Sequence, residues 1–193
     1  MKTFMMALGA VALLGGCASR AEEEPPMAAS TMDPMSPLAA PGFMMMAASS
    51  DQFEIQSSRM ALQMSRNAQV RSFAQMMIDH HSRTTAELMS LAQANGLNPP
   101  PPTLMPQHQA MLDRIRAAAP GDFDAAYKRE QIASHEEALS LMRNYSTSGD
   151  LPPFRDFAAR TSPIIEQHLS QAQALPEYMA PMAPQPARAG ERG

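Results

Sequence analysis

The sequence predicts an all-α protein, a four-helix bundle with a long crossover between its second and third helices. Aromatic residues make up only 5% of the chain and tryptophan is absent, which disfavours a fold based on a sheet. Most of the 18 prolines fall into three groups, and long helical segments lie between those groups. A chain of 193 residues is long enough for one domain with tails.

Residues 1–16 resemble a bacterial lipoprotein signal peptide. Lys2 precedes an apolar run over 4–14, and Leu14-Gly15-Gly16-Cys17 follows directly. The resemblance implies that Cys17 is lipidated and anchors the chain to a membrane. Because no Asp follows Cys17, we expect the outer membrane, with the protein facing the periplasm. The alternative is an ordinary secretory signal in which the cysteine occurs by chance.

A stalk rich in proline and methionine is predicted over residues 17–50, and a second disordered tail over 177–193. Neither segment shows a helical or strand period. Thioethers are soft ligands that suit Cu(I), so the stalk methionines could capture copper; the alternative is that they fill space in low-complexity sequence. These methionines are Met27, Met32, Met35 and Met44 to Met46.

The bundle domain is predicted over residues 51–176, and its first half contains two long helices. The first covers residues 51–66. The second covers 70–95, where Asn95-Gly96 ends it ahead of Pro99. A short joint makes these two helices antiparallel neighbours, and the long connection that follows has room for a short helix over 106–118.

The second half of the predicted bundle domain also contains two long helices joined by a short connection. Asp122 is the expected N-cap of a helix that reaches about Tyr145. Pro152-Pro153 begins the last helix, which ends before Pro176 and is expected to kink at Pro163. The long connection before Asp122 allows the chain to cross the length of the bundle.

Each long helix places one side chain of metal-ligand type on its predicted inward face. With ~100° between successive residues, Glu54 lies opposite the polar stripe of the first helix. His80 lies near the centre of the inward stripe of the second helix, with His81 at its edge. His135 and His168 point inward from the third and fourth helices.

A carboxylate with up to three neutral imidazoles is a ligand set for Zn, Cu, Fe or Ni. Such groups cost about 1–3 kcal/mol each when buried without partners, so something must satisfy them. The alternative is a hydrogen-bonded cluster with trapped water that only fixes the register of the bundle. Asp124, Glu87 and Gln131 are weaker candidates for outer ligands.

Several stretches of residues 51–175 together resemble a family of exported bacterial proteins known as domain of unknown function 4142. The resemblance implies a ferritin-like fold and a location in the cell envelope, but no established activity. It also singles out Glu54, Asp79, His80, Asp124, His135 and His168 as matches to the polar motifs of the family. The stretches that carry it are Phe53-Glu54-Ile55, Phe73 to His80, Phe123 to Tyr127, Ser134-His135-Glu136 and Gln167-His168-Leu169.

Two further comparisons limit the chemistry. True di-iron ferritin sites need Glu three residues before the ligating His, and here Met77 and Ile165 stand in those places. A di-iron oxidase is therefore disfavoured. The run from Met76 to His81 is similar, over a short stretch, to small envelope proteins associated with copper that carry paired histidines after a methionine-rich helix.

The leading functional hypothesis is an envelope lipoprotein that binds a transition-metal ion for buffering or stress protection. The alternative is a non-catalytic structural or protein-interaction module of the envelope. No nucleophile or base motif predicts turnover, so no catalytic residue is assigned. A formal net charge of −4 argues against nucleic acid as a partner.

Overall fold

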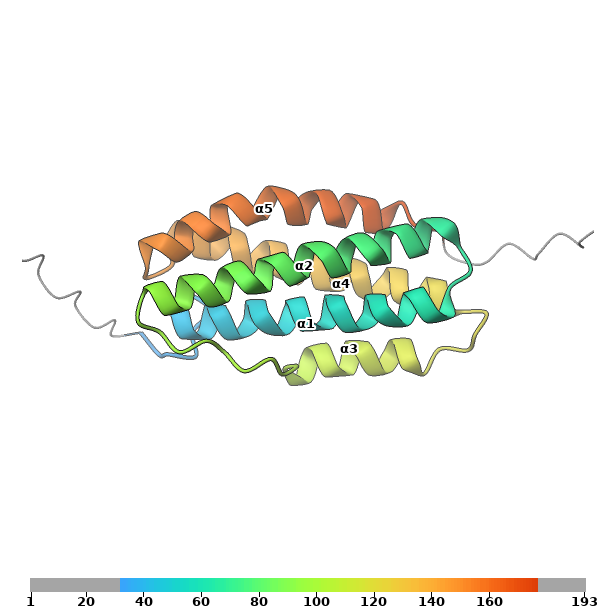
Figure 1. Cartoon of the computed structure of the whole chain (residues 1–193), viewed down its shortest axis with the longest axis horizontal. Helices are drawn as coiled ribbons and strands as arrows, with labels where there is room; N and C mark the ends of the chain where they lie inside the picture. The colour runs from blue at the N-terminus through green and yellow to red at the C-terminus, as the bar shows by residue number, and fades with distance from the viewer. Residues whose placement is uncertain (1–31, 177–193) are drawn as a thin grey trace, which may run out of the picture.

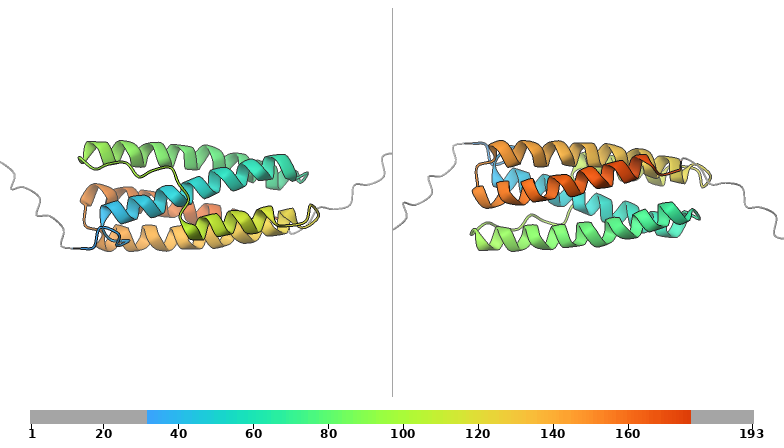
Figure 2. Two further views of the ribbon diagram at one scale, coloured as in Figure 1. Left: turned by 90° about the horizontal axis from the view of Figure 1, so that it is seen from below. Right: turned by 90° about the horizontal axis from the view of Figure 1, so that it is seen from above.

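The computed structural model describes residues 32–176, which form five helices and no strand (Figure 1). Four long helices make an antiparallel bundle, which confirms the predicted fold class. The short helix lies in the crossover and packs along two of the long ones (Figure 2). The helices are α1 (Ala40–Met64), α2 (Ala68–Ala94), α3 (Pro106–Arg116), α4 (Phe123–Ser148) and α5 (Pro152–Gln173).

The first helix starts at Ala40 and not at the predicted Asp51. Residues 40–50 are therefore helical, and the prediction of a disordered stalk is wrong for them. Pro41 occupies the first turn, where its missing N–H is tolerated, and the alanines and methionines that follow are strong helix formers. Met44 is 2% exposed, so it is a core residue and not part of a flexible copper-capturing stalk.

The ends of the other helices follow local chemistry that the sequence displays. The Asn67 side chain accepts hydrogen bonds from the backbone N–H groups of Gln69 and Val70 and so caps α2. Gly96, with φ 68°, ends the same helix. Asp122 stands at the N-cap of α4, as predicted, but its side chain makes no capping bond. α5 runs through Pro163 without a break.

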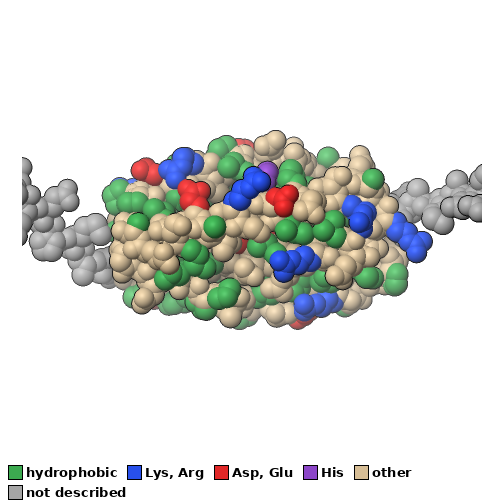
Figure 3. Space-filling model, in the orientation of Figure 1, with side chains coloured by type: hydrophobic (Ala, Val, Ile, Leu, Met, Phe, Trp, Pro, Cys, Tyr) green, Lys and Arg blue, Asp and Glu red, His purple; other side chains and the backbone are tan. Residues whose placement is uncertain are grey.

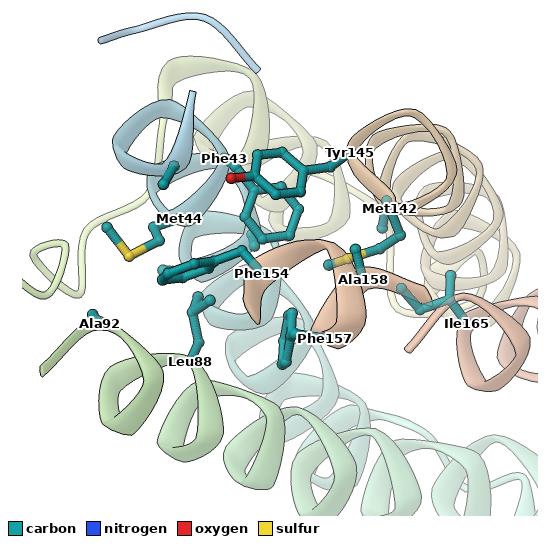
Figure 4. Packing of buried hydrophobic residues seen from close by; sticks show 14 of the residues in the cluster. Phe43, Met44, Leu88, Ala92, Met142, Tyr145, Phe154, Phe157, Ala158 and Ile165 are labelled. Atoms are coloured by element: carbon teal, nitrogen blue, oxygen red, sulfur yellow. The ribbon is translucent and has the colours of Figure 1, made fainter. Parts of the chain in front are cut away.

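Two apolar clusters fill the bundle, one toward each end. The Phe43 cluster packs α1, α2, α4 and α5 around Phe43, Phe154 and Phe157, and Tyr145 stacks on Phe43 with ring centroids 4.0 Å apart (Figure 4). The Phe53 cluster occupies the other end and contains Phe53, Phe73, Phe123 and Tyr127. Each long helix carries buried polar side chains where it passes from one cluster to the other.

Charged side chains are scattered over the face shown in Figure 3 and do not form a single patch. No helix within residues 32–176 is long and apolar enough to span a membrane. The predicted signal peptide, Cys17, the first part of the stalk and the tail over 177–193 lie outside the described residues.

Candidate metal centre

Three imidazole rings meet between the two apolar clusters, one from each of α2, α4 and α5. The ring centroids of His81 and His135 are 5.7 Å apart, and His168 lies 5.6 Å from the first and 5.5 Å from the second. All three side chains are buried. One ring nitrogen from each lies within 4.8 Å of the other two, which is the spacing of a group that could hold a metal ion.

Each of these rings has one nitrogen engaged and one free. Nδ1 of His81 lies 2.7 Å from Oδ1 of Asp51, and Nδ1 of His135 donates to the Gln131 carbonyl at 2.8 Å. Nε2 of His168 lies 2.8 Å from Nδ1 of His80. The remaining nitrogens are buried without a hydrogen-bond partner: Nε2 of His81, Nε2 of His135 and Nδ1 of His168. Fixing the proton on one nitrogen leaves the lone pair of the other for a metal.

Helix α1 supplies the acidic groups behind two of these rings. Asp51 and Glu54 lie one turn apart, and Oε1 of Glu54 is 3.5 Å from Nδ1 of His135. The other oxygen of Asp51 accepts a hydrogen bond from Thr85. Glu54 is 1% exposed, and neither of its oxygens has a hydrogen-bond partner. Two buried acidic side chains beside three imidazole rings give this part of the core an electrostatic preference for a cation.

The environment keeps two of the rings in the neutral form that binds metal. Burial and the neighbouring imidazoles lower the pKa of His168 to about 2, and burial also lowers the pKa of His135. For His81, burial opposes protonation, but the hydrogen bond and charge of Asp51 outweigh it and raise the pKa. At His81 a metal ion must therefore compete with a proton for the ring nitrogen.

A cavity of about 20 Å³ adjoins the cluster, which is room for a single water molecule or ion. His81, His168, Asp51 and the thioether residue Met142 are among the side chains that line it. Two nitrogens bound to one metal at about 2.0–2.1 Å lie at most ~4.2 Å apart. Because one ring nitrogen from each histidine already lies within 4.8 Å of the other two, the rings need only small shifts to close on an ion.

The structure brings together three of the four predicted ligands and leaves the fourth, His80, at the edge of the cluster. Glu54, His135 and His168 are buried at one level, with the contacts described above. On α2 the two expected positions are reversed, because His81 is 5% exposed and faces the cluster while His80 is partly exposed. His80 contacts His168 of the cluster through a hydrogen bond and through stacking of the two rings, but it is not one of the three clustered histidines.

The two second-tier candidates lie away from the cluster. Asp79 is exposed and accepts a hydrogen bond from Gln75. Asp124 is 2% exposed and both of its oxygens lack hydrogen-bond partners, but it stands about three turns from His135 along α4. Sequence reasoning missed Asp51, which it placed only at the first position of a helix and did not count among the inward side chains. The signal that could have found it is its spacing one turn before Glu54 on the same face.

Comparison with known proteins places the chain in a family. The model of the family described as a domain of unknown function, DUF4142, matches residues 24–175. The chain belongs to the DUF4142 family. No curated protein matches it.

Two similar solved structures share the helical fold of this DUF4142 protein. One is CopM in the Cu(II)-bound form, with TM-score 0.61 and 23% identity over 70% of this chain and 94% of that one. The other is CopM in the Ag-bound form, with TM-score 0.59 and 20% identity over 70% of this chain and 93% of that one. At this level of identity the likeness shows the fold alone.

Proposed function

We propose that this DUF4142 protein binds one transition-metal ion between His81, His135 and His168. The observation that carries the proposal is the arrangement of the ring nitrogens. Each ring has one nitrogen held by a partner and the other without a partner, and one ring nitrogen from each lies within 4.8 Å of the other two in the core. Leaving three such groups without a partner costs free energy that a bound ion recovers.

Copper is the metal that the donor set favours. Imidazole suits Zn, Cu, Fe and Ni, and among divalent ions Cu²⁺ binds such sites most tightly. The thioether of Met142, which lines the adjacent cavity, adds a soft donor that suits copper better than zinc. The similar solved structures are copper- and silver-bound forms of CopM, which supports this choice.

The proposed role is metal buffering or protection against metal stress in the cell envelope. The small volume of the cavity, about 20 Å³, accommodates an ion but no organic substrate, which supports binding over turnover. The predicted signal peptide and Cys17 anchor would place the bundle at the outer membrane, facing the periplasm. The likeness to CopM supports a copper-handling role but does not bear on the anchor.

Equilibrium titration with Cu(II), and with Ag(I) as a soft probe, tests the proposal on the full chain purified without a polyhistidine tag. We expect about one tight equivalent per chain, lost in H81A, H135A and H168A. H108A is the matched control, because His108 is also buried but bonds Ser49 and lies outside the cluster. Circular dichroism verifies that each variant is folded.

Two results would contradict the proposal. One is less than about a tenth of an equivalent bound by the native chain. The other is the same loss of binding in H108A as in the three cluster variants. Either result would leave the cluster as a hydrogen-bonded packing element of the bundle.

A further inference from the structure

The seam between α2 and α5 is the loosest contact between neighbouring long helices of the bundle. A groove of about 460 Å³ runs along this seam. Phe73 and Met76 of α2 and Gln171 and Leu175 of α5 are among the residues that line it. Of these lining residues, Met76 lies one turn before His80 on α2 and Gln171 lies one turn after His168 on α5, so the groove ends about one turn from the level of the metal centre.

His80 stands on this seam, one turn beyond Met76 along α2. Of the histidines within residues 32–176, it is the one whose side chain is not buried, and histidine atoms reach the surface over the α2–α5 seam in Figure 3. Its ring stacks on His168 with centroids 5.0 Å apart and planes inclined by 28°. His80 thus contacts both solvent and one proposed ligand.

The two ring nitrogens of His168 have different surroundings. Its Nε2 meets Nδ1 of His80 at 2.8 Å, and its Nδ1 is a free buried nitrogen of the three-histidine cluster. One imidazole therefore separates the partly exposed ring of His80 from the interior site. Rotation of the His168 side chain about its terminal torsion would present a nitrogen first to the seam and then to the cluster.

We propose that His80 is an access ligand: the ion binds first at His80, with the Met76 thioether one turn away, and then passes to His168. This inference rests on the proposed function of the cluster. In the transfer, the bond from the ion to His80 breaks as the bond to His168 forms, and the charge of the ion does not change. His80 is not among the ligands of the final site.

A group that acts only on the path changes rates and not the equilibrium. His80 should speed uptake and release by the same factor, since both directions cross the same barrier. The dissociation constant Kd should stay the same. A ligand of the final site would instead change Kd, mostly through release.

Stopped-flow uptake of Cu(II) by the full chain, paired with release to a strong chelator, tests the inference. His80→Leu removes the metal-donating side chain at this position. His80→Met has a similar volume and supplies a thioether, which can also bind the ion. We expect H80L to slow both uptake and release at least about tenfold, with Kd within about threefold of native, and H80M to recover most of the rate. Asp79→Asn, at the neighbouring exposed position that bonds Gln75 instead of a ring of the cluster, should leave both rates unchanged.

Three outcomes would overturn the access role while leaving the metal site intact. They are native rates in H80L, equal slowing in H80L and H80M, and a weaker Kd at an unchanged rate of uptake. If the native chain bound no copper, the proposed function itself would fail, and the access role with it. The equilibrium titration of the native chain distinguishes these cases.

Discussion

The metal-free protein should lose stability steeply below pH 6.5 because of two buried imidazoles. In the folded chain the pKa of His168 is lowered to about 2 and that of His135 is lowered as well, against a usual value of 6.5. Below pH 6.5 the unfolded chain therefore binds protons that the folded chain does not. The contribution of these two rings to stability is full above pH 6.5 and falls with the pH below it.

The magnitude follows from proton counting. Each histidine that stays neutral only in the folded state contributes about 1.4 kcal/mol per pH unit to the fall in unfolding free energy. His168 alone gives about 1.2 kcal/mol between pH 6 and pH 5, out of a total of about 5–15 kcal/mol for a typical domain, and His135 adds to this loss in the same direction. The pKa of His81 is raised, so its effect lies above pH 6.5 and does not offset this loss.

Urea unfolding followed by circular dichroism at pH 7, 6 and 5, in the presence of a chelator, measures the effect. The matched variant is His168→Gln, whose amide nitrogen can still reach His80 but does not titrate. Its slope should be smaller than the native slope by about 1.4 kcal/mol per pH unit. Equal slopes in the two proteins would refute the assignment of a depressed pKa to His168.

Three further outcomes are expected. Asp51→Asn should weaken copper binding by about 10–100-fold in equilibrium titration while the fold is kept, whereas Asp79→Asn should have no effect. Copper at about 100 times its Kd should raise the unfolding free energy by about 2.7 kcal/mol, and H135A should abolish this gain. Asp150→Ala should cost about 1–2 kcal/mol in urea unfolding, because Asp150 accepts from Ala40 N–H at the start of α1 and from the Tyr145 hydroxyl; Asp150→Asn should cost less.

The helical periodicity was sufficient to predict most of the fold. Proline and glycine mark the ends of α2, α3 and α5, and the 100° spacing placed Glu54, His135 and His168 on inward faces. The start of α1 was misplaced because its first turns are alanine and methionine beside prolines. Such a composition is shared by disordered segments, and burial against α4 and α5 is what makes it helical here.

The site was harder to predict at the level of single residues. His80 and His81 are only one step apart on α2, so a small rotation of the helix about its axis exchanges which of them points inward. That rotation is set by the packing of α2 on α1 and by the bond between His81 and Asp51. Asp51 in turn is buried because α1 extends upstream to Ala40, which the sequence did not reveal.

An anomalous-difference map from crystals of the full chain grown with Cu(II) tests the central claim most directly. We expect one strong peak between α2, α4 and α5, about 2.1 Å from a ring nitrogen of each of His81, His135 and His168. A map with copper only at surface side chains, and the three rings still bonded solely to their protein partners, would contradict it.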